Sequence, residues 1–280
     1  MLAHDRLLDI VENFILFDES KPGATRKVVG RNHQVLGVNL AVSSVEHQEG
    51  LKREFPPKRR LQHRVIELPL ERRAIADERR RLSAPQSETK APALPSFIPE
   101  GPVEIVERAH PDLGRLGVFW HTQGSGKSYS MAFFAEKVRR KVPGNFTFLL
   151  MTDRHDLDDQ IYKTFVGSGV AGKDTPRAGT GVDLERLLKE NHPYVFSLIH
   201  KFNKNVDPKH PYSERDDIIV ISDEAHRTQS GRLARNMRLA LPNAAFIGFT
   251  GTPLFKQDEL TKRIFGVSVC RGPSCAGLSD

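Results

Sequence analysis

The sequence predicts an α/β protein built on a parallel β-sheet with helices on both faces. After Gly114, short apolar runs alternate with amphipathic helical patterns, which is typical of consecutive β-α-β units. The runs show little alternation between apolar and polar residues, as expected of strands that are covered on both faces. A chain of 280 residues with 38% hydrophobic residues is also long enough to bury a sizeable core. The predicted strands are 116–120, 147–152, 194–199, 218–222 and 245–250.

Residues 1–45 are expected to form a mainly helical segment that precedes the sheet. Apolar residues recur at helical spacing over 1–17, which predicts an amphipathic helix that Pro22-Gly23 ends. Residues 28–42 predict a short extended piece that leads into a second helix, and this pattern is lost after Ser44. The apolar positions are Leu2, Leu7, Leu8, Val11, Phe14 and Ile15 in the first helix and Val35, Val38 and Val42 in the second.

Residues 46–112 differ in composition and are interpreted as a basic, Pro-rich linker or insertion. Prolines such as Pro56-Pro57 remove backbone donors and disfavour a continuous helix or a central strand, although 68–82 could form a basic helix. Between residues 51 and 82 there are eleven Lys or Arg against five acids, which accounts for most of the net charge of +7. Such a cluster suits a nucleic-acid partner, and a solvated linker is an equally good interpretation.

The composition also excludes several classes of protein. No stretch approaches the roughly 20 apolar residues that a bilayer-spanning helix needs, and the N-terminus has acids where a signal peptide has basic charge. We therefore expect a cytoplasmic protein without a membrane segment. Cys270 and Cys275 are the two cysteines of the chain, which excludes a disulfide framework, and both are expected to be free thiols.

The first predicted strand leads directly into His121-Thr-Gln-Gly-Ser-Gly-Lys-Ser128, which a helix-compatible run follows. Glycines at 124 and 126 allow the backbone to curl so that its N–H groups point at phosphate oxygens. Lys127 is expected to reach the β and γ phosphates of a nucleotide, and the Ser128 hydroxyl to bind Mg²⁺. His121 stands where the strict motif has glycine, but a chance Gly-Lys-Ser is disfavoured because both flanking elements are present. The predicted phosphate-binding residues are Thr122, Gln123, Gly124, Ser125, Gly126, Lys127 and Ser128.

A second, acidic motif ends the strand 218–222, where the sequence continues as Asp223-Glu-Ala-His226. An acid at the carboxyl end of a buried strand beside the phosphate-loop strand is placed to be a second Mg²⁺ ligand, and this acid is Asp223. Glu224 would act as a base that polarises the attacking water. The alternative is a helix N-terminus, where acids interact favourably with the helix dipole.

The run 249–253, Phe-Thr-Gly-Thr-Pro, is a third motif and ends the last predicted strand. The hydroxyls of Thr250 and Thr252 would lie at the carboxyl edge of the sheet, within reach of Asp223 or His226, and would report nucleotide state. An ordinary Thr/Gly/Pro turn is the alternative interpretation.

Together the three motifs resemble those of superfamily 2 helicases and translocases, and their flanking residues resemble the motor (R) subunit of type I restriction enzymes. The resemblance is close over 114–268 and loose over 5–42. It is specific, because the first two of the matching strings are diagnostic of that family. The strings are Trp120-His-Thr-Gln-Gly-Ser-Gly-Lys-Ser128, Thr152-Asp-Arg-His-Asp-Leu-Asp-Asp-Gln160, Asp223-Glu-Ala-His-Arg-Thr-Gln-Ser-Gly231 and Gly248-Phe-Thr-Gly-Thr-Pro253.

The resemblance implies an ATP-driven DNA translocase whose RecA-like ATP-binding domain spans 113–268, with 269–280 as a tail. Lys127, Asp223 and Glu224 would be its catalytic residues, with ATP as substrate and Mg²⁺ as cofactor. Double-stranded DNA and the methylation and specificity subunits of a type I restriction complex would be its partners.

The resemblance also assigns residues outside the three motifs. Gln34, in Arg31-Asn-His-Gln34, would pair with the adenine of ATP. Arg154 and Gln160, on the loop and helix after the second strand, would contact the phosphates of a DNA strand. An acid cluster at a helix N-terminus is a comparable interpretation of that segment.

The sequence departs from the family in two respects. The family's nuclease needs a strand-borne acid and an acid-x-Lys pair, whereas Glu88-Thr-Lys90 lies in a Pro/Ser-rich stretch and is interpreted as chance. After Gly266 we expect no second RecA-like domain, which would supply an arginine finger. The expectation is therefore a fragment of such a motor. The alternatives are a non-catalytic or decayed nucleotide- or nucleic-acid-binding fragment and a fragment of another superfamily 2 helicase.

Overall fold

The computed structural model describes residues 4–21, 23–66, 103–120, 122, 124–204, 206–223, 231–251 and 268–270. The chain divides into two compact units. The larger unit consists of residues 1–55 and 112–280, and the smaller unit of residues 56–111. In the described part of the chain, no helix has the length and apolar character needed to cross a bilayer.

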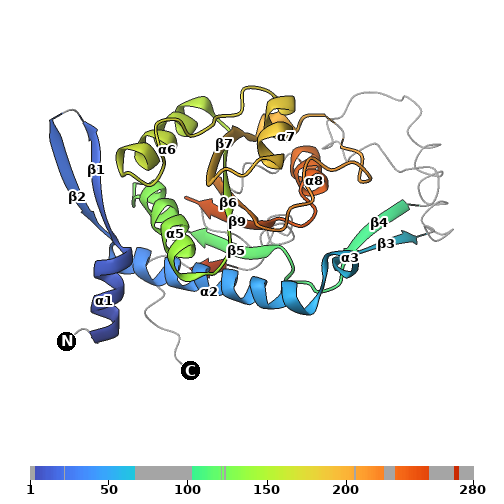
Figure 1. The fold of residues 1–280 in the computed structure, drawn as a ribbon, viewed down its shortest axis with the longest axis horizontal. Coiled ribbons are helices and arrows are strands. Elements are labelled where there is room, and N and C mark those ends of the chain that lie inside the picture. The colour runs from blue at the N-terminus through green and yellow to red at the C-terminus, as the bar shows by residue number, and fades with distance from the viewer. Residues whose placement is uncertain are drawn as a thin grey trace, which may run out of the picture. The chain divides into compact units, whose positions relative to one another are not determined.

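A six-stranded sheet forms the centre of the larger unit (Figure 1). Every strand pairing in it is parallel, so the predicted α/β fold class is confirmed. The five predicted strands occur within one residue of their predicted ends, and a short sixth strand adds an edge that the sequence pattern does not indicate. In sheet order the strands are β10 (Ser268–Cys270), β5 (Arg115–Trp120), β9 (Ala245–Thr250), β8 (Ile218–Asp223), β6 (Thr147–Thr152) and β7 (Tyr194–Leu198).

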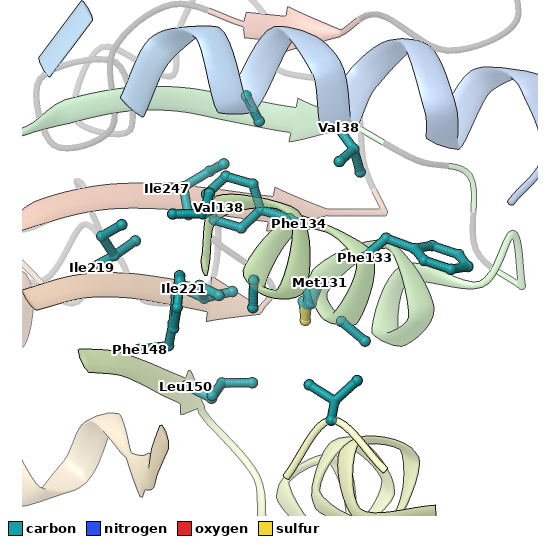
Figure 2. Close-up of a cluster of buried hydrophobic side chains, with 14 of the residues drawn as sticks. Val38, Met131, Phe133, Phe134, Val138, Phe148, Leu150, Ile219, Ile221 and Ile247 are labelled. Carbon is teal, nitrogen blue, oxygen red and sulfur yellow. The ribbon is translucent and has the colours of Figure 1, made fainter. Parts of the chain in front are cut away.

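Two hydrophobic cores cover the two faces of this sheet, because successive apolar residues of its strands point in opposite directions. In β8, Ile219 and Ile221 belong to one core, whereas Ile218 and Val220 belong to the other. Figure 2 shows the first core, where side chains of the phosphate-loop helix lie against those of the central strands. The first core includes residues of α2 (Asn32–Glu54), α5 (Lys127–Lys141) and α6 (His155–Gly167), and the second includes residues of α7 (Gly181–Lys189), η1 (Ile199–Phe202) and α8 (Gly231–Ala240).

The N-terminal segment departs from the helix predicted over 1–17. Helix α1 (His4–Asn13) ends at Asn13. Strands β1 (Ile15–Lys21) and β2 (Ala24–Val29) follow it and form an antiparallel hairpin. The apolar residues that follow Asn13 have the period of a strand, since Leu16 is buried and Phe17 is exposed. The predicted helix is therefore wrong beyond Asn13.

The second N-terminal helix is confirmed and is longer than predicted. Helix α2 buries the three valines that were expected to face the core, and it continues to Glu54. The prediction that the pattern ends after Ser44 is wrong, because Val45, Gln48 and Leu51 extend the buried face. A single helix thus crosses the predicted boundary between residues 45 and 46.

The smaller unit contains a pair of strands within the Pro-rich segment. Helix α3 (Pro57–Arg60) leads into β3 (Leu61–Ile66), which pairs antiparallel with β4 (Val103–Arg108). An isolated pair is compatible with the expectation that prolines exclude a central strand, since no proline lies within either strand. Residues 67–102 lie outside the described residues, and with them the basic helix predicted at 68–82 and the Glu88–Lys90 stretch.

Candidate functional site

The predicted phosphate loop forms a tight turn between β5 and α5. Gly124 and Gly126 have φ of +79° and +90°, values that side-chain-bearing residues rarely adopt. The turn is closed by Ser125, whose N–H and hydroxyl both donate to the Thr122 carbonyl oxygen, at 3.1 and 2.6 Å. Helix α5 then starts at Lys127, with Gly126 in the N-cap position. The loop therefore presents backbone N–H groups at a helix N-terminus, which is the arrangement that binds phosphate.

Lys127 and Asp223 meet at the carboxyl edge of the sheet. The Lys127 Nζ lies 3.3 Å from the Asp223 Oδ1, and the two side chains are 15% and 7% exposed. Two largely buried groups of opposite charge compensate each other at this distance. The structure thus brings together the lysine and the acid that were predicted from separate motifs.

The strand order corrects one expectation about this pair. Strand β8, which ends in Asp223, was expected beside the phosphate-loop strand, but β9 lies between them. The register aligns Trp120 with Thr250 and Asp223 with Phe249, so β5, β9 and β8 all end at the same edge. The acid therefore reaches the site from the next strand but one.

The third motif begins on this middle strand. Thr250 is fully buried at the end of β9, and the indole Nε1 of Trp120 lies 3.4 Å from the carbonyl oxygen of Gly251. This contact links the residue before the phosphate loop to the third motif. The coupling role of Thr250 stays a prediction, and Gln123, Glu224, His226 and Thr252 lie outside the described residues.

Gln34 lies at the start of α2 and is bonded to the phosphate loop. Its Nε2 donates to the Gly126 carbonyl oxygen at 3.1 Å and to the Ser130 Oγ at 3.0 Å. Its Oε1 accepts a hydrogen bond from the Arg31 N–H at 2.8 Å. Both N–H groups of the amide are thus used within the protein, and the predicted pairing of Gln34 with adenine stays a prediction.

His33, beside Gln34, is a neighbour of the loop that sequence reasoning missed. Burial lowers the pKa of His33 below its ordinary value of 6.5, and the Arg31 charge lowers it further, whereas a hydrogen bond with the Ser125 backbone opposes both. Its place in Arg31-Asn-His-Gln34, next to the predicted adenine reader, is the signal that could have identified it.

The predicted DNA contacts lie at the carboxyl edge of β6. Arg154 is exposed and makes two hydrogen bonds to the Asp156 carboxylate, at 3.1 and 2.9 Å, and Gln160 is exposed on α6. The His200 Nε2 lies 3.1 Å from the carbonyl oxygen of Asp153, which joins the segments that follow β6 and β7. His200 was not singled out from the sequence, although it directly follows a predicted strand.

These features define a class of protein. A glycine-rich loop at a helix N-terminus, a lysine at its end and an acid on a nearby strand of a parallel sheet are the features typical of nucleoside triphosphate sites of the P-loop type. Residues 101–271 match the family model described as SWI2/SNF2 ATPase, and the chain belongs to this family. The nucleotide that this family description implies is ATP.

Two relatives indicate which kind of ATPase this chain is similar to. The type I restriction enzyme HindI endonuclease subunit of Haemophilus influenzae is 33% identical over 95% of this chain. The MjaIXP protein of Methanocaldococcus jannaschii, whose name describes it as a type I restriction enzyme endonuclease subunit, is 41% identical over 56% of this chain. The predicted resemblance to type I restriction subunits is confirmed. The chain spans 21% and 15% of the lengths of these relatives.

Among solved structures, the UvsW helicase of bacteriophage T4 matches with a TM-score of 0.43. That match has 17% identity and covers 58% of this chain and 55% of the helicase chain.

Proposed function

We propose that this chain is the first motor domain of a type I restriction endonuclease R subunit, where ATP hydrolysis drives translocation on double-stranded DNA and restriction. The observation that carries the proposal is the approach of Lys127 to Asp223, 3.3 Å apart, beside the glycine-rich loop. The RecA-like domain would span 113–268, preceded by the segments 1–45 and 46–112 and followed by 269–280. Methylation and specificity subunits would be its partners in the cytoplasm.

The oxygen ligands at the site suit Mg²⁺. The hydroxyl of Ser128 and the carboxylate of Asp223 are hard oxygen donors, which Mg²⁺ prefers, and a nucleotide would add phosphate oxygens. When bound, Mg²⁺ neutralises charge that develops on the transferred phosphoryl group. Lys127, now paired with Asp223, would turn to the β and γ phosphates. Glu224 would take a proton from the attacking water.

The experiment separates nucleotide binding from hydrolysis in the purified chain. Lys127→Ala should weaken the binding of a fluorescent ATP analogue at least about tenfold, because it removes a charged contact to phosphate. Glu224→Gln should keep wild-type affinity and lose the residual ATP hydrolysis, because Glu224 acts on water rather than on the bound nucleotide. Chelation of Mg²⁺ should weaken binding in the wild type.

Two results would contradict the assignment. If Lys127→Ala, folded by circular dichroism, bound the analogue as the wild type does, the loop would not be the phosphate site. If Glu224→Gln retained hydrolysis, the base would be another residue. A wild-type chain that binds ATP, with no hydrolysis even when DNA and the methylation and specificity subunits are added, would favour the non-catalytic alternative.

A further inference from the structure

The β1–β2 hairpin contacts the first turn of the phosphate-loop helix. Tyr129 directly follows Ser128, and its hydroxyl donates to the Asp18 Oδ2 of strand β1. Arg26 of β2 donates through Nη2 to the same carboxylate oxygen at 3.0 Å and to the Tyr129 Oη at 2.6 Å. Asp18, Tyr129 and Arg26 thus form a closed set of hydrogen bonds, which we call the hairpin anchor.

The hairpin anchor depends on a buried negative charge. Burial raises the pKa of Asp18, but hydrogen bonds from Tyr129, Ser20 and Arg26 together outweigh it and bring the pKa to about 2. The Asp18 carboxylate is therefore ionised at neutral pH, with a side chain that is 6% exposed. A buried carboxylate held by several donors is a rigid acceptor, and its geometry fixes the groups that donate to it.

The first turn of α5 needs such support from outside the helix. Its N-cap, Gly126, offers no side-chain hydrogen bond to the first turn, unlike the Ser, Thr, Asp or Asn residues that usually cap helices. The two residues after Ser128 supply the missing support, because Tyr129 is held by the hairpin anchor and Ser130 by Gln34. The N-terminal segment thus holds the same turn at two consecutive residues.

We propose that Asp18 is a positioning residue of the ATP site, which acts through Tyr129 to fix the directions of Lys127 and Ser128. The inference rests on the proposed function of the phosphate loop and adds to it a residue that does not touch the nucleotide. In enzymes a misplacement of about 1 Å can cost on the order of 100-fold in rate, so a small rotation of this turn is sufficient to impair the alignment of Lys127 and Ser128 with the phosphates.

A second contact of the Asp18 carboxylate, with Gly167, allows its position to be changed by a different substitution. Gly167, the last residue of α6, packs against strand β1, and a Cβ at this position would lie 2.8 Å from the Ser20 Cβ and 3.1 Å from the Asp18 Oδ1. Both distances are too short for ordinary contacts, so Gly167→Ala would push Ser20 and Asp18 away. This variant should therefore disturb the phosphate site from the far end of another helix.

The experiment measures the affinity of the full chain for fluorescent ATP and GTP analogues in Asp18→Asn, Tyr129→Phe and the double variant. Each single variant should weaken the binding of both analogues by about tenfold, because Lys127 and Ser128 would be less well aligned with the phosphates. The double variant should be no weaker than the singles, because both remove the same contact. Equal losses of affinity for the ATP and GTP analogues would indicate that Asp18 acts on the phosphate contacts and not on recognition of the base. Gly167→Ala should weaken binding in the same direction.

Asp9→Asn is the matched control. Asp9 pairs with Lys137 of α5, about 15 Å further along this helix from Lys127, and its side chain is 22% exposed. This variant should lower the unfolding midpoint and leave both affinities unchanged. If it weakened binding as much as Asp18→Asn, or if Tyr129→Phe bound both analogues as the wild type does, Asp18 would have a structural role alone. Should Asp18→Asn fail to fold, Tyr129→Phe decides the question.

The outcomes also distinguish this inference from the proposed function. Loss of binding in Lys127→Ala with wild-type binding in Tyr129→Phe would overturn the positioning role and keep the ATP site. Wild-type binding in Lys127→Ala would overturn both.

Discussion

Two ionisable side chains next to the first turn of α5 are both deprotonated at neutral pH, so that one carries a negative charge and the other is neutral. Asp18 keeps its negative charge because its pKa lies at about 2, and His33 keeps a neutral ring because burial places its pKa below 6.5. One of them contacts Tyr129 and the other the Ser125 backbone. The surroundings of the phosphate loop therefore keep a constant charge at neutral pH and change when the pH falls.

We expect the folded chain to lose stability as the pH falls below about 6.5, with a contribution from His33. The folded state disfavours the charged ring, so the unfolded state binds more protons in this window, and the unfolding free energy rises with pH. His33→Asn should flatten this dependence between about pH 5 and 7, measured by urea denaturation. His47→Asn, which removes an exposed imidazole from the same helix, is the control. An unchanged profile in His33→Asn would contradict the prediction.

Single residues were predictable where a motif surrounds them. Lys127 and Asp223 are recognised because glycines, a helix and an apolar strand flank them in fixed order, and the structure brings the two together. The pair of Asp18 and Tyr129 has no such local signal, because its members are 111 positions apart and each is unremarkable in its own segment. Contacts of this kind depend on tertiary packing rather than on neighbouring residues.

At the scale of elements, burial on both faces made the strands predictable and left their order open. A run such as 218–222 is apolar throughout because one set of residues faces each core. Nothing in the run specifies its neighbours, so the insertion of β9 between β5 and β8 was missed. The hairpin was misassigned for a related reason, since the few apolar residues around Phe14 fit a helix and a strand equally well.

Strand β8 contributes residues to both cores and ends in Asp223 of the candidate site. Loss of its buried side chains should therefore lower the free energy of unfolding. Ile221 is 1% exposed in the first core (Figure 2), and it lies two residues before Asp223 in the sequence. Ile221→Ala should destabilise the chain by about 2–5 kcal/mol, because it removes buried methyl groups and leaves a cavity. The measurement is the unfolding free energy from urea denaturation. Val182→Ala, at a 67% exposed position of α7, should change it by less than about 0.5 kcal/mol. A loss in Ile221→Ala as small as in this control would contradict the packing described.

At the scale of the whole chain, positive charge is concentrated in one segment of the sequence. The net charge is +7, and residues 51–82 contain eleven basic and five acidic residues. On α7, by contrast, basic side chains are paired with acids of the helix or of its C-cap: Arg186 with Asp183 and the C-cap Glu190, and Lys189 with Glu185. Positive charge gathered in one segment, rather than spread evenly over the surface, is typical of proteins that bind a polyanion.

DNA binding by this chain should therefore be independent of sequence and weaken steeply with salt. Counterion release gives a log–log slope of about −0.9 for each duplex phosphate neutralised, so glutamine at the five arginines 72, 73, 79, 80 and 81 should reduce the slope by up to about 4.5. The measurement is the anisotropy of a labelled duplex between about 50 and 200 mM salt. The double variant Arg186→Gln, Lys189→Gln is the control. Because these two charges are already paired with acids, the salt dependence of DNA binding should equal that of the wild type. A five-arginine variant with the wild-type slope would identify the segment as a solvated linker and move the DNA contact to the sheet edge near Arg154 and Gln160.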